Sequence, residues 1–149
     1  MKLYPWSCMT AAAALVLDVD EWDIHVNIGH NGGEVIRPSY ADVRRYRGFH
    51  TQELIDVLLR HYKRSSALID PHPRLMIAGR EPELIFSDLV AQQRWERYLE
   101  DYNGVLFGQF PNKRCDHALA VIDGVGTNPD NGEVVDISYF LPKGYLIIE

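Results

Sequence analysis

Residues 7–17, Ser-Cys-Met-Thr-Ala-Ala-Ala-Ala-Leu-Val-Leu, decide the fold because they predict a buried helix that begins at a cysteine. The run contains no glycine or proline and is rich in alanine, the residue with the highest helix propensity. We expect the helix to extend from Ser7 or Cys8 to Val19, with Ser7 as its N-cap. Cys8 then lies where unpaired backbone N–H groups and the helix dipole favour a thiolate.

The composition is that of a globular protein. The chain has 149 residues, of which 46% are hydrophobic, and this suffices for a single domain spanning residues 1–149 with a sizeable core. The net charge is −6 and there is no basic run, which argues against nucleic acid or an anionic membrane as the main partner. No apolar stretch approaches the roughly 20 residues that cross a bilayer. The N-terminus also lacks a signal-peptide pattern, so we expect a cytoplasmic protein.

Helices dominate the expected structure before residue 104. A helix is expected from Thr51, interpreted as its N-cap, and a longer one over about Glu83–Tyr102, which Asn103-Gly104 ends as a C-cap. Residues 22–28 alternate apolar and polar side chains, which indicates a short strand or an extended loop. Pro38-Ser39 indicates the start of a further short helix.

Strands dominate the C-terminal part of the chain. One earlier strand is expected over residues 66–69, and four more follow residue 104, over residues 105–107, 117–123, 133–137 and 145–148. Helices first and consecutive strands later indicate an α+β domain, in which N-terminal helices pack on a C-terminal antiparallel sheet.

Two residues of the C-terminal part could activate Cys8. His117 opens the apolar strand 117–123, and Asp136 lies near the end of the next expected strand. If these two strands pair across the loop 124–132, Asp136 comes close to His117, where a carboxylate would fix the imidazole tautomer and orient the ring toward Cys8. Three other residues are rivals for this orienting role: Asp123, Asn128 and Asp130.

These three local contexts resemble a known family. Cys8 at the start of an alanine-rich helix, the segment His117-Ala-Leu-Ala-Val-Ile-Asp-Gly and the segment Val-Val-Asp136 are similar to the bacteriocin-processing (double-glycine) peptidases and their relatives in the papain-like superfamily. The resemblance covers nearly the whole chain and rests on the order and context of these residues. It implies a papain-like α+β fold and a Cys8–His117–Asp136 catalytic triad.

The sequence departs from that family around the expected oxyanion hole. The peptidases usually carry a glutamine shortly before the cysteine, whereas none of the seven residues before Cys8 is Gln or Asn. One oxyanion donor could be the backbone N–H of Cys8. For a second donor, three residues are candidates by position: Trp6, Ser7 and Gln109.

The leading functional hypothesis is therefore a cysteine peptidase that acts on a peptide or isopeptide bond without a metal or other cofactor. The first alternative is a catalytically impaired papain-like module that binds a protein partner, for example within a phage or other particle. The second is a related acyl-transfer or amidase activity. A metal site at His25 and His30 with Asp23, and a disulfide between Cys8 and Cys115, are minor alternatives.

Overall fold

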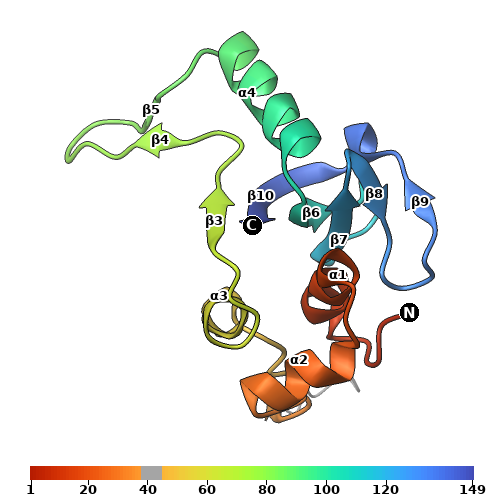
Figure 1. The fold of residues 1–149 in the computed structure, drawn as a ribbon. Coiled ribbons are helices and arrows are strands. Elements are labelled where there is room, and N and C mark those ends of the chain that lie inside the picture. Colours follow the sequence, from red (N-terminus) through yellow and green to blue (C-terminus); the bar gives the residue numbers. More distant parts are fainter. Residues whose placement is uncertain (38–44) are drawn as a thin grey trace.

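A computed structural model describes residues 1–37 and 45–149 of the chain (Figure 1). The helices are α1 (Cys8–Leu17), α2 (Glu21–Ile28), α3 (Thr51–Arg60) and α4 (Asp88–Asp101), with a short 3-10 turn η1 (Ile137–Tyr139). The strands are β1 (Val35–Arg37), β2 (Arg45–Tyr46), β3 (Ser66–Ile69), β4 (Arg74–Leu75), β5 (Glu83–Leu84), β6 (Gly104–Gln109), β7 (His117–Ile122), β8 (Val125–Thr127), β9 (Val134–Val135) and β10 (Leu141–Ile148). The fold is thus mixed helix and strand, as expected. The helix expected from Pro38 lies outside the described residues.

The main sheet has six strands in the order β3-β10-β6-β7-β8-β9, and every neighbouring pair is antiparallel. Side chains of β7 alternate between its two faces. Ala118 and Ala120 belong to the core cluster under α1, α2 and α3, whereas Leu119 and Val121 belong to the cluster that includes Leu99 of α4. The sheet is therefore covered on both faces; the sequence predicted helices packed on an antiparallel sheet but not how they divide between its two faces.

Helix α1 packs on β6 and β7 through small side chains. Ala12 and Ala13 are fully buried, as are Val105 and Ala120 on the sheet beneath them. Alanine against alanine lets the helix backbone approach the strands closely, and any larger side chain there has to displace one of them. This contact fixes where the N-terminus of α1 lies along β7.

Residues 21–28 form helix α2 rather than the expected strand or loop. Asp20 caps the helix by accepting the N–H of Trp22 at 2.9 Å, and Gly29 ends it with a φ of 98°. The four alternating apolar residues form two pairs at a spacing of four residues, which is one helical turn: Trp22 with Val26, and Ile24 with Ile28. Trp22 and Val26 are exposed, whereas Ile24 is fully buried in the core.

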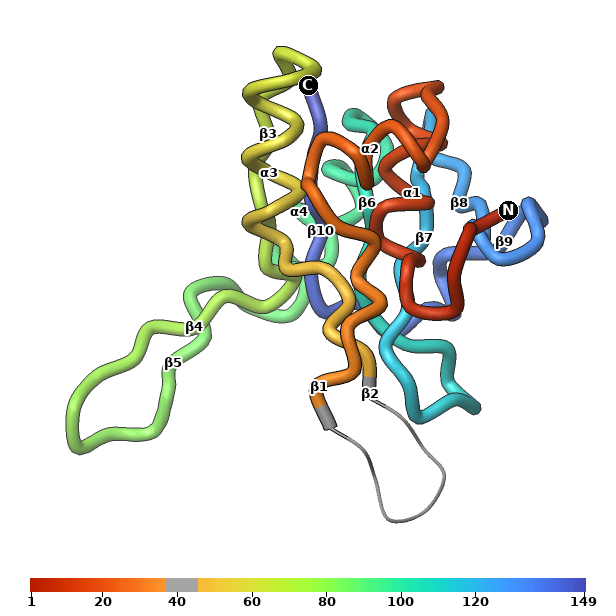
Figure 2. Tube along the Cα trace, turned by 90° about the horizontal axis from the view of Figure 1, so that it is seen from below, coloured from red at the N-terminus to blue at the C-terminus, as the bar shows by residue number. Residues whose placement is uncertain are grey.

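Two other helix boundaries differ from the expectation. The N-cap of α3 is His50, not Thr51: its Nδ1 accepts the N–H of Gln52 at 3.1 Å, and the Glu53 carboxylate accepts the N–H of His50 at 2.8 Å. Helix α4 begins at Asp88, because Glu83–Leu84 instead pairs with Arg74–Leu75. This β4–β5 hairpin extends away from the sheet (Figure 2).

The C-terminal hairpins also differ from the expected pairing. Strand β7 turns at Asp123-Gly124, where both residues have positive φ, and returns at once as β8. A two-residue turn with this sequence is a strong hairpin signal. Strand β9 then pairs with β8, so it lies one strand further from β7 than the sequence interpretation placed it. None of the helices in the described part of the chain has the length and apolar character that crossing a membrane requires.

We predict that Ala13→Leu destabilises the protein by about 1–3 kcal/mol, because the larger side chain forces α1 away from β7. Urea unfolding monitored by circular dichroism measures the change in the free energy of unfolding. Leu59→Ala on α3 is a suitable control, since Leu59 is 60% exposed and its truncation should change stability by less than about 0.5 kcal/mol. Unchanged stability in Ala13→Leu would show that the helix–strand contact is loose.

Candidate functional site

The start of α1 and the start of β7 lie side by side at the same end of the sheet (Figure 2). Cys8 is the first residue of α1 and is partly buried against the core cluster that contains Ala118. The backbone N–H groups of Ala118 and Met9 interact with its thiol. Ala118 directly follows His117, so the fold brings Cys8 next to the first peptide unit of β7.

Burial dominates the electrostatics of Cys8 and raises the pKa of its thiol above the ordinary value. The positive charge of Lys2 and the backbone N–H groups of Ala118 and Met9 lower that pKa in part, while Asp130 raises it. The sequence predicted a helix N-terminus that favours the thiolate. Desolvation outweighs that effect, so the resting thiol is protonated at neutral pH.

Lys2 is a residue that sequence analysis did not identify. Its ammonium group pairs with Asp130 at 2.7 Å, and its backbone N–H donates to the carbonyl of Pro129 at 2.8 Å. These bonds hold the N-terminal segment beside the loop that follows β8. No local sequence signal marks Lys2, because its partners lie more than 120 residues away in the chain.

His117 is oriented by Asn128. Its Nε2 lies 2.9 Å from Oδ1 of Asn128, and its ring lies 5.5 Å from the ring of Phe110. An amide oxygen can only accept, so this contact places the proton of a neutral imidazole on Nε2 and leaves Nδ1 as the basic nitrogen. The contact that the Cys8 thiol makes with β7 is to the next residue, at the backbone N–H of Ala118.

The structure does not bring Asp136 to His117. In the β7–β8–β9 register, Ile122 pairs with Val125, and Gly126 pairs with Val135. Asp136 is therefore level with Ile122, at the end of β7 opposite His117. Five residues along a strand and two strands across correspond to roughly 17 Å and roughly 10 Å. The Asp136 carboxylate instead accepts the N–H of Ser138 at 3.0 Å and its hydroxyl at 2.6 Å.

The three side chains considered as oxyanion donors are engaged elsewhere. The Ser7 hydroxyl is fully buried and donates to the carbonyl of Tyr4 at 3.0 Å. The Trp6 indole N–H donates to the carbonyl of Asn31 at 2.8 Å, and the Gln109 amide donates to Asp116 at 2.9 Å. The sequence positions of these residues are close to Cys8 or His117, but their bonds stabilise turns and loops.

Backbone N–H groups of Met9 on α1 and Ala118 on β7 are donors near the thiol. Ser7 is the N-cap, yet its side chain makes no capping bond to the helix. The first hydrogen bond of the helix runs from the N–H of Ala11 to the carbonyl of Ser7, at 2.9 Å. The N–H groups of residues 8–10 precede it and so have no acceptor within the regular helical pattern. The N–H of Cys8 therefore lies at a helix start without a side-chain cap, where the helix dipole favours negative charge.

The histidines considered as metal ligands occupy separate polar clusters. His25 is 2% exposed and its Nε2 lies 2.8 Å from the Thr10 hydroxyl and 3.2 Å from the Glu21 carboxylate. His30 instead contacts Glu53 at 2.9 Å. Within residues 1–37 and 45–149 no group of three or more His, Cys, Asp or Glu side chains is arranged to hold a metal ion. Both cysteines are free thiols.

Comparisons with known proteins identify no relative of this chain: no family model, curated protein or solved structure matches it.

We predict that alkylation of Cys8 is slow at neutral pH and accelerates into the alkaline range, because burial raises the pKa of the thiol. In a Cys115→Ser background, the half-maximal rate with iodoacetamide should occur at a higher pH than for N-acetylcysteine. Lys2→Met should shift it further upward, whereas Lys63→Met, on the exposed loop after α3, should leave it in place. A midpoint below that of N-acetylcysteine would contradict the burial argument.

We also predict that stability falls on acidification because of His25, whose pKa burial lowers despite the neighbouring Glu21 carboxylate. In the unfolded chain His25 binds a proton at about pH 6.5, whereas in the folded state it binds one only at lower pH. The free energy of unfolding therefore decreases as the pH falls through about 6.5. His25→Gln should reduce the difference in urea midpoint between pH 7.5 and 5.5, and exposed His72→Gln should not. An identical difference in wild type and His25→Gln would exclude His25 as its source.

Proposed function

We propose that the protein is a papain-like cysteine peptidase, in which Cys8 is the nucleophile, His117 is the general base and acid, and Asn128 is the positioning residue. The observation that carries this proposal is the 2.9 Å contact of His117 Nε2 with the Asn128 amide, at the strand end on which the Cys8 thiol packs. A nucleophile, a base and a group that orients the base are the parts that covalent acyl chemistry requires.

The chemistry begins from a neutral pair. Because the thiol is protonated at rest, Nδ1 of His117 removes its proton as the sulfur attacks the carbonyl of a peptide or isopeptide bond. The negative charge on the carbonyl oxygen develops toward the N–H of Cys8 at the helix start. The imidazolium then donates its proton to the leaving amine, and a thioester forms on Cys8. Water, deprotonated by His117, hydrolyses the thioester and restores the thiol.

A second function, a binding module with the same fold, is favoured by the raised pKa of Cys8 and by the occupied side chains of Trp6, Ser7 and Gln109. Loss of one oxyanion donor commonly lowers the rate by about two to three decades. The two functions therefore differ in whether the backbone donor at Cys8 suffices for turnover.

We predict that a library of short, uncharged peptides yields cleavage products that Cys8→Ala abolishes and that His117→Ala reduces by about 10²–10⁴-fold. Asn128→Ala should lower kcat and alter its pH profile, because the ring loses its fixed tautomer. Mass spectrometry identifies the cleaved bonds.

Two matched controls accompany these variants. Cys115→Ser removes the exposed second thiol, and Asp123→Asn alters the exposed turn between β7 and β8; both should leave the rates unchanged. Cleavage that persists in Cys8→Ala would refute the assignment of the nucleophile. A wild-type protein that cleaves no peptide of the library would favour the binding module.

A further inference from the structure

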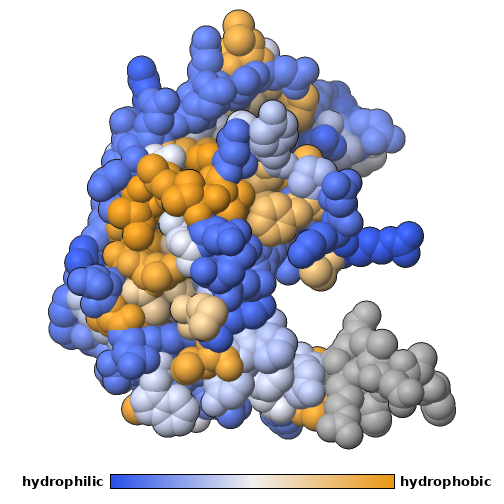
Figure 3. Space-filling model, turned by 90° about the vertical axis from the view of Figure 1, so that its right-hand side faces the viewer, coloured by the Kyte–Doolittle hydropathy of each residue, from blue (hydrophilic) through white to orange (hydrophobic). Residues whose placement is uncertain are grey.

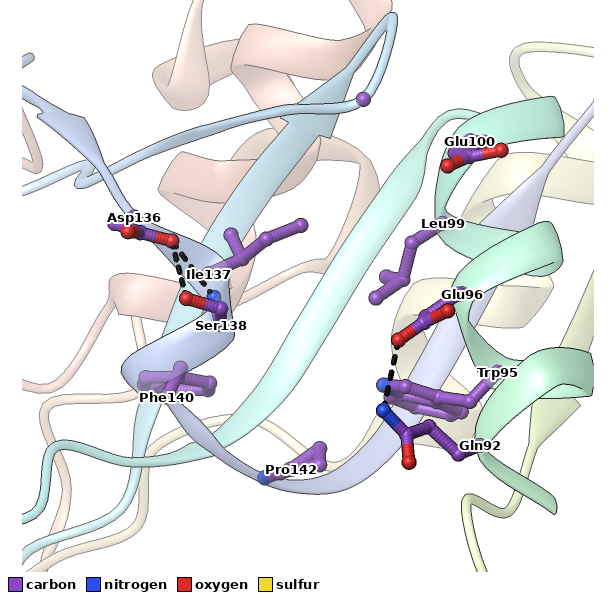
Figure 4. A pocket seen from close by; sticks show the side chains of 11 residues that line it. Gln92, Trp95, Glu96, Leu99, Glu100, Asp136, Ile137, Ser138, Phe140 and Pro142 are labelled. Atoms are coloured by element: carbon purple, nitrogen blue, oxygen red, sulfur yellow. Dashed lines mark hydrogen bonds between the residues drawn. The ribbon is translucent and has the colours of Figure 1, made fainter. Parts of the chain in front are cut away.

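A pocket of about 390 Å³ opens on the face of the sheet opposite α1, between α4 and the segment around η1 (Figure 4). Its apolar lining comes from both sides: Trp95 and Leu99 project from α4, and Ile137 and Phe140 face them from the η1 segment. The volume lies within the range of small-ligand sites in proteins. The pocket runs along the sheet from Gly124, beyond the end of β7, to Pro142, which is level with His117 across β6.

Three carboxylates surround this apolar lining, and no basic side chain is among the residues that form the pocket. Glu96 and Glu100 are one helical turn apart on α4, so their like charges repel each other, and Glu96 also accepts a hydrogen bond from the Gln92 amide at 3.0 Å. Asp136 faces them from the other wall, held in place by the N–H and hydroxyl of Ser138. Among the ion pairs between described residues, none includes these three carboxylates.

The Trp95 ring, which lines the pocket, packs against the core of the sheet. It lies edge-on to Tyr145 of β10, with ring centroids 6.1 Å apart, and Tyr145 is fully buried. An aromatic face beside carboxylates attracts a cation that carries an apolar stem. The same helix shows this chemistry within the chain, where Arg94 lies 5.2 Å from the ring centroids of both Phe86 and Tyr98.

We propose that this pocket binds a lysine or arginine side chain of the polypeptide substrate and so acts as an exosite remote from the cleaved bond; this inference rests on the proposed peptidase function. Charge complementarity selects the basic side chain, and the apolar lining accommodates its methylene stem or a neighbouring apolar residue. Asp136 is level with the end of β7 opposite His117, roughly 17 Å along the strand. An extended chain covers about 3.3–3.6 Å per residue, so the basic residue lies at least about five or six residues from the scissile bond.

Binding can be tested without turnover in the Cys8→Ala protein. The probe is a fluorescein-labelled peptide in which arginine and leucine alternate between flanking Gly-Ser segments. The control peptide carries glutamate in place of each arginine. Fluorescence anisotropy should show binding of the arginine peptide only. The triple variant Glu96→Gln/Glu100→Gln/Asp136→Asn should weaken this binding about tenfold, as expected for three weak charge pairs between exposed groups. Trp95→Leu should weaken it as well, since the aromatic face is lost.

A matched triple variant, Glu81→Gln/Glu83→Gln/Asp88→Asn, changes the net charge equally on the β4–β5 hairpin and at the start of α4. Equal weakening in both triples would overturn the pocket assignment, because the attraction would then come from the net charge. Spermine that binds as tightly as the peptide would overturn the assignment to a polypeptide and identify a small organic cation instead. Pocket-dependent binding without any cleavage by wild type overturns the peptidase function alone. Cleavage without pocket-dependent binding overturns the exosite alone.

Discussion

The close packing of α1 on β7 is the contact on which the candidate site depends. Ala12 and Ala13 of α1 share one buried cluster with Ala118 and Ala120 of β7, and these small side chains let the helix approach the strand closely. This contact brings the first residue of one element to the first residue of the other. Apolar side chains are not confined to this buried contact. Figure 3 shows that they also gather on one outer face of the molecule.

The sequence predicted those parts of the site that depend on local pattern. An alanine-rich run after Ser7 and an apolar run after His117 each indicate their own element, and both begin where expected. The partner of His117 depends on strand register, which no single segment encodes. The Asp123-Gly124 turn was the available signal, and it was interpreted as part of a longer loop. Asn128 was then only one of several candidates, although the tight turn returns it to His117.

Neutral buried groups characterise the N-terminal half of the core. The Cys8 thiol has a raised pKa and His25 a lowered one, both because burial disfavours the charged form. Glu21 provides the compensating bonds: it accepts the N–H of Leu3 at 2.8 Å and lies against Thr10 and His25. Thus the segment before Cys8 is held from one side by Glu21 and from the other by the ion pair of Lys2. The local dielectric around the Cys8 thiol depends on this segment remaining in place.

The two-residue turn between β7 and β8 has a consequence for comparing related sequences. Because side chains alternate along a strand, one inserted residue between Ile122 and Val125 would turn the side chain of the residue at position 128 to the other face of the sheet. A length change in the loop 129–132 would displace β9 but leave the partner of His117 unaltered. The orienting residue in a homologue is therefore found by counting from the turn, and an asparagine or aspartate at another spacing is not its equivalent.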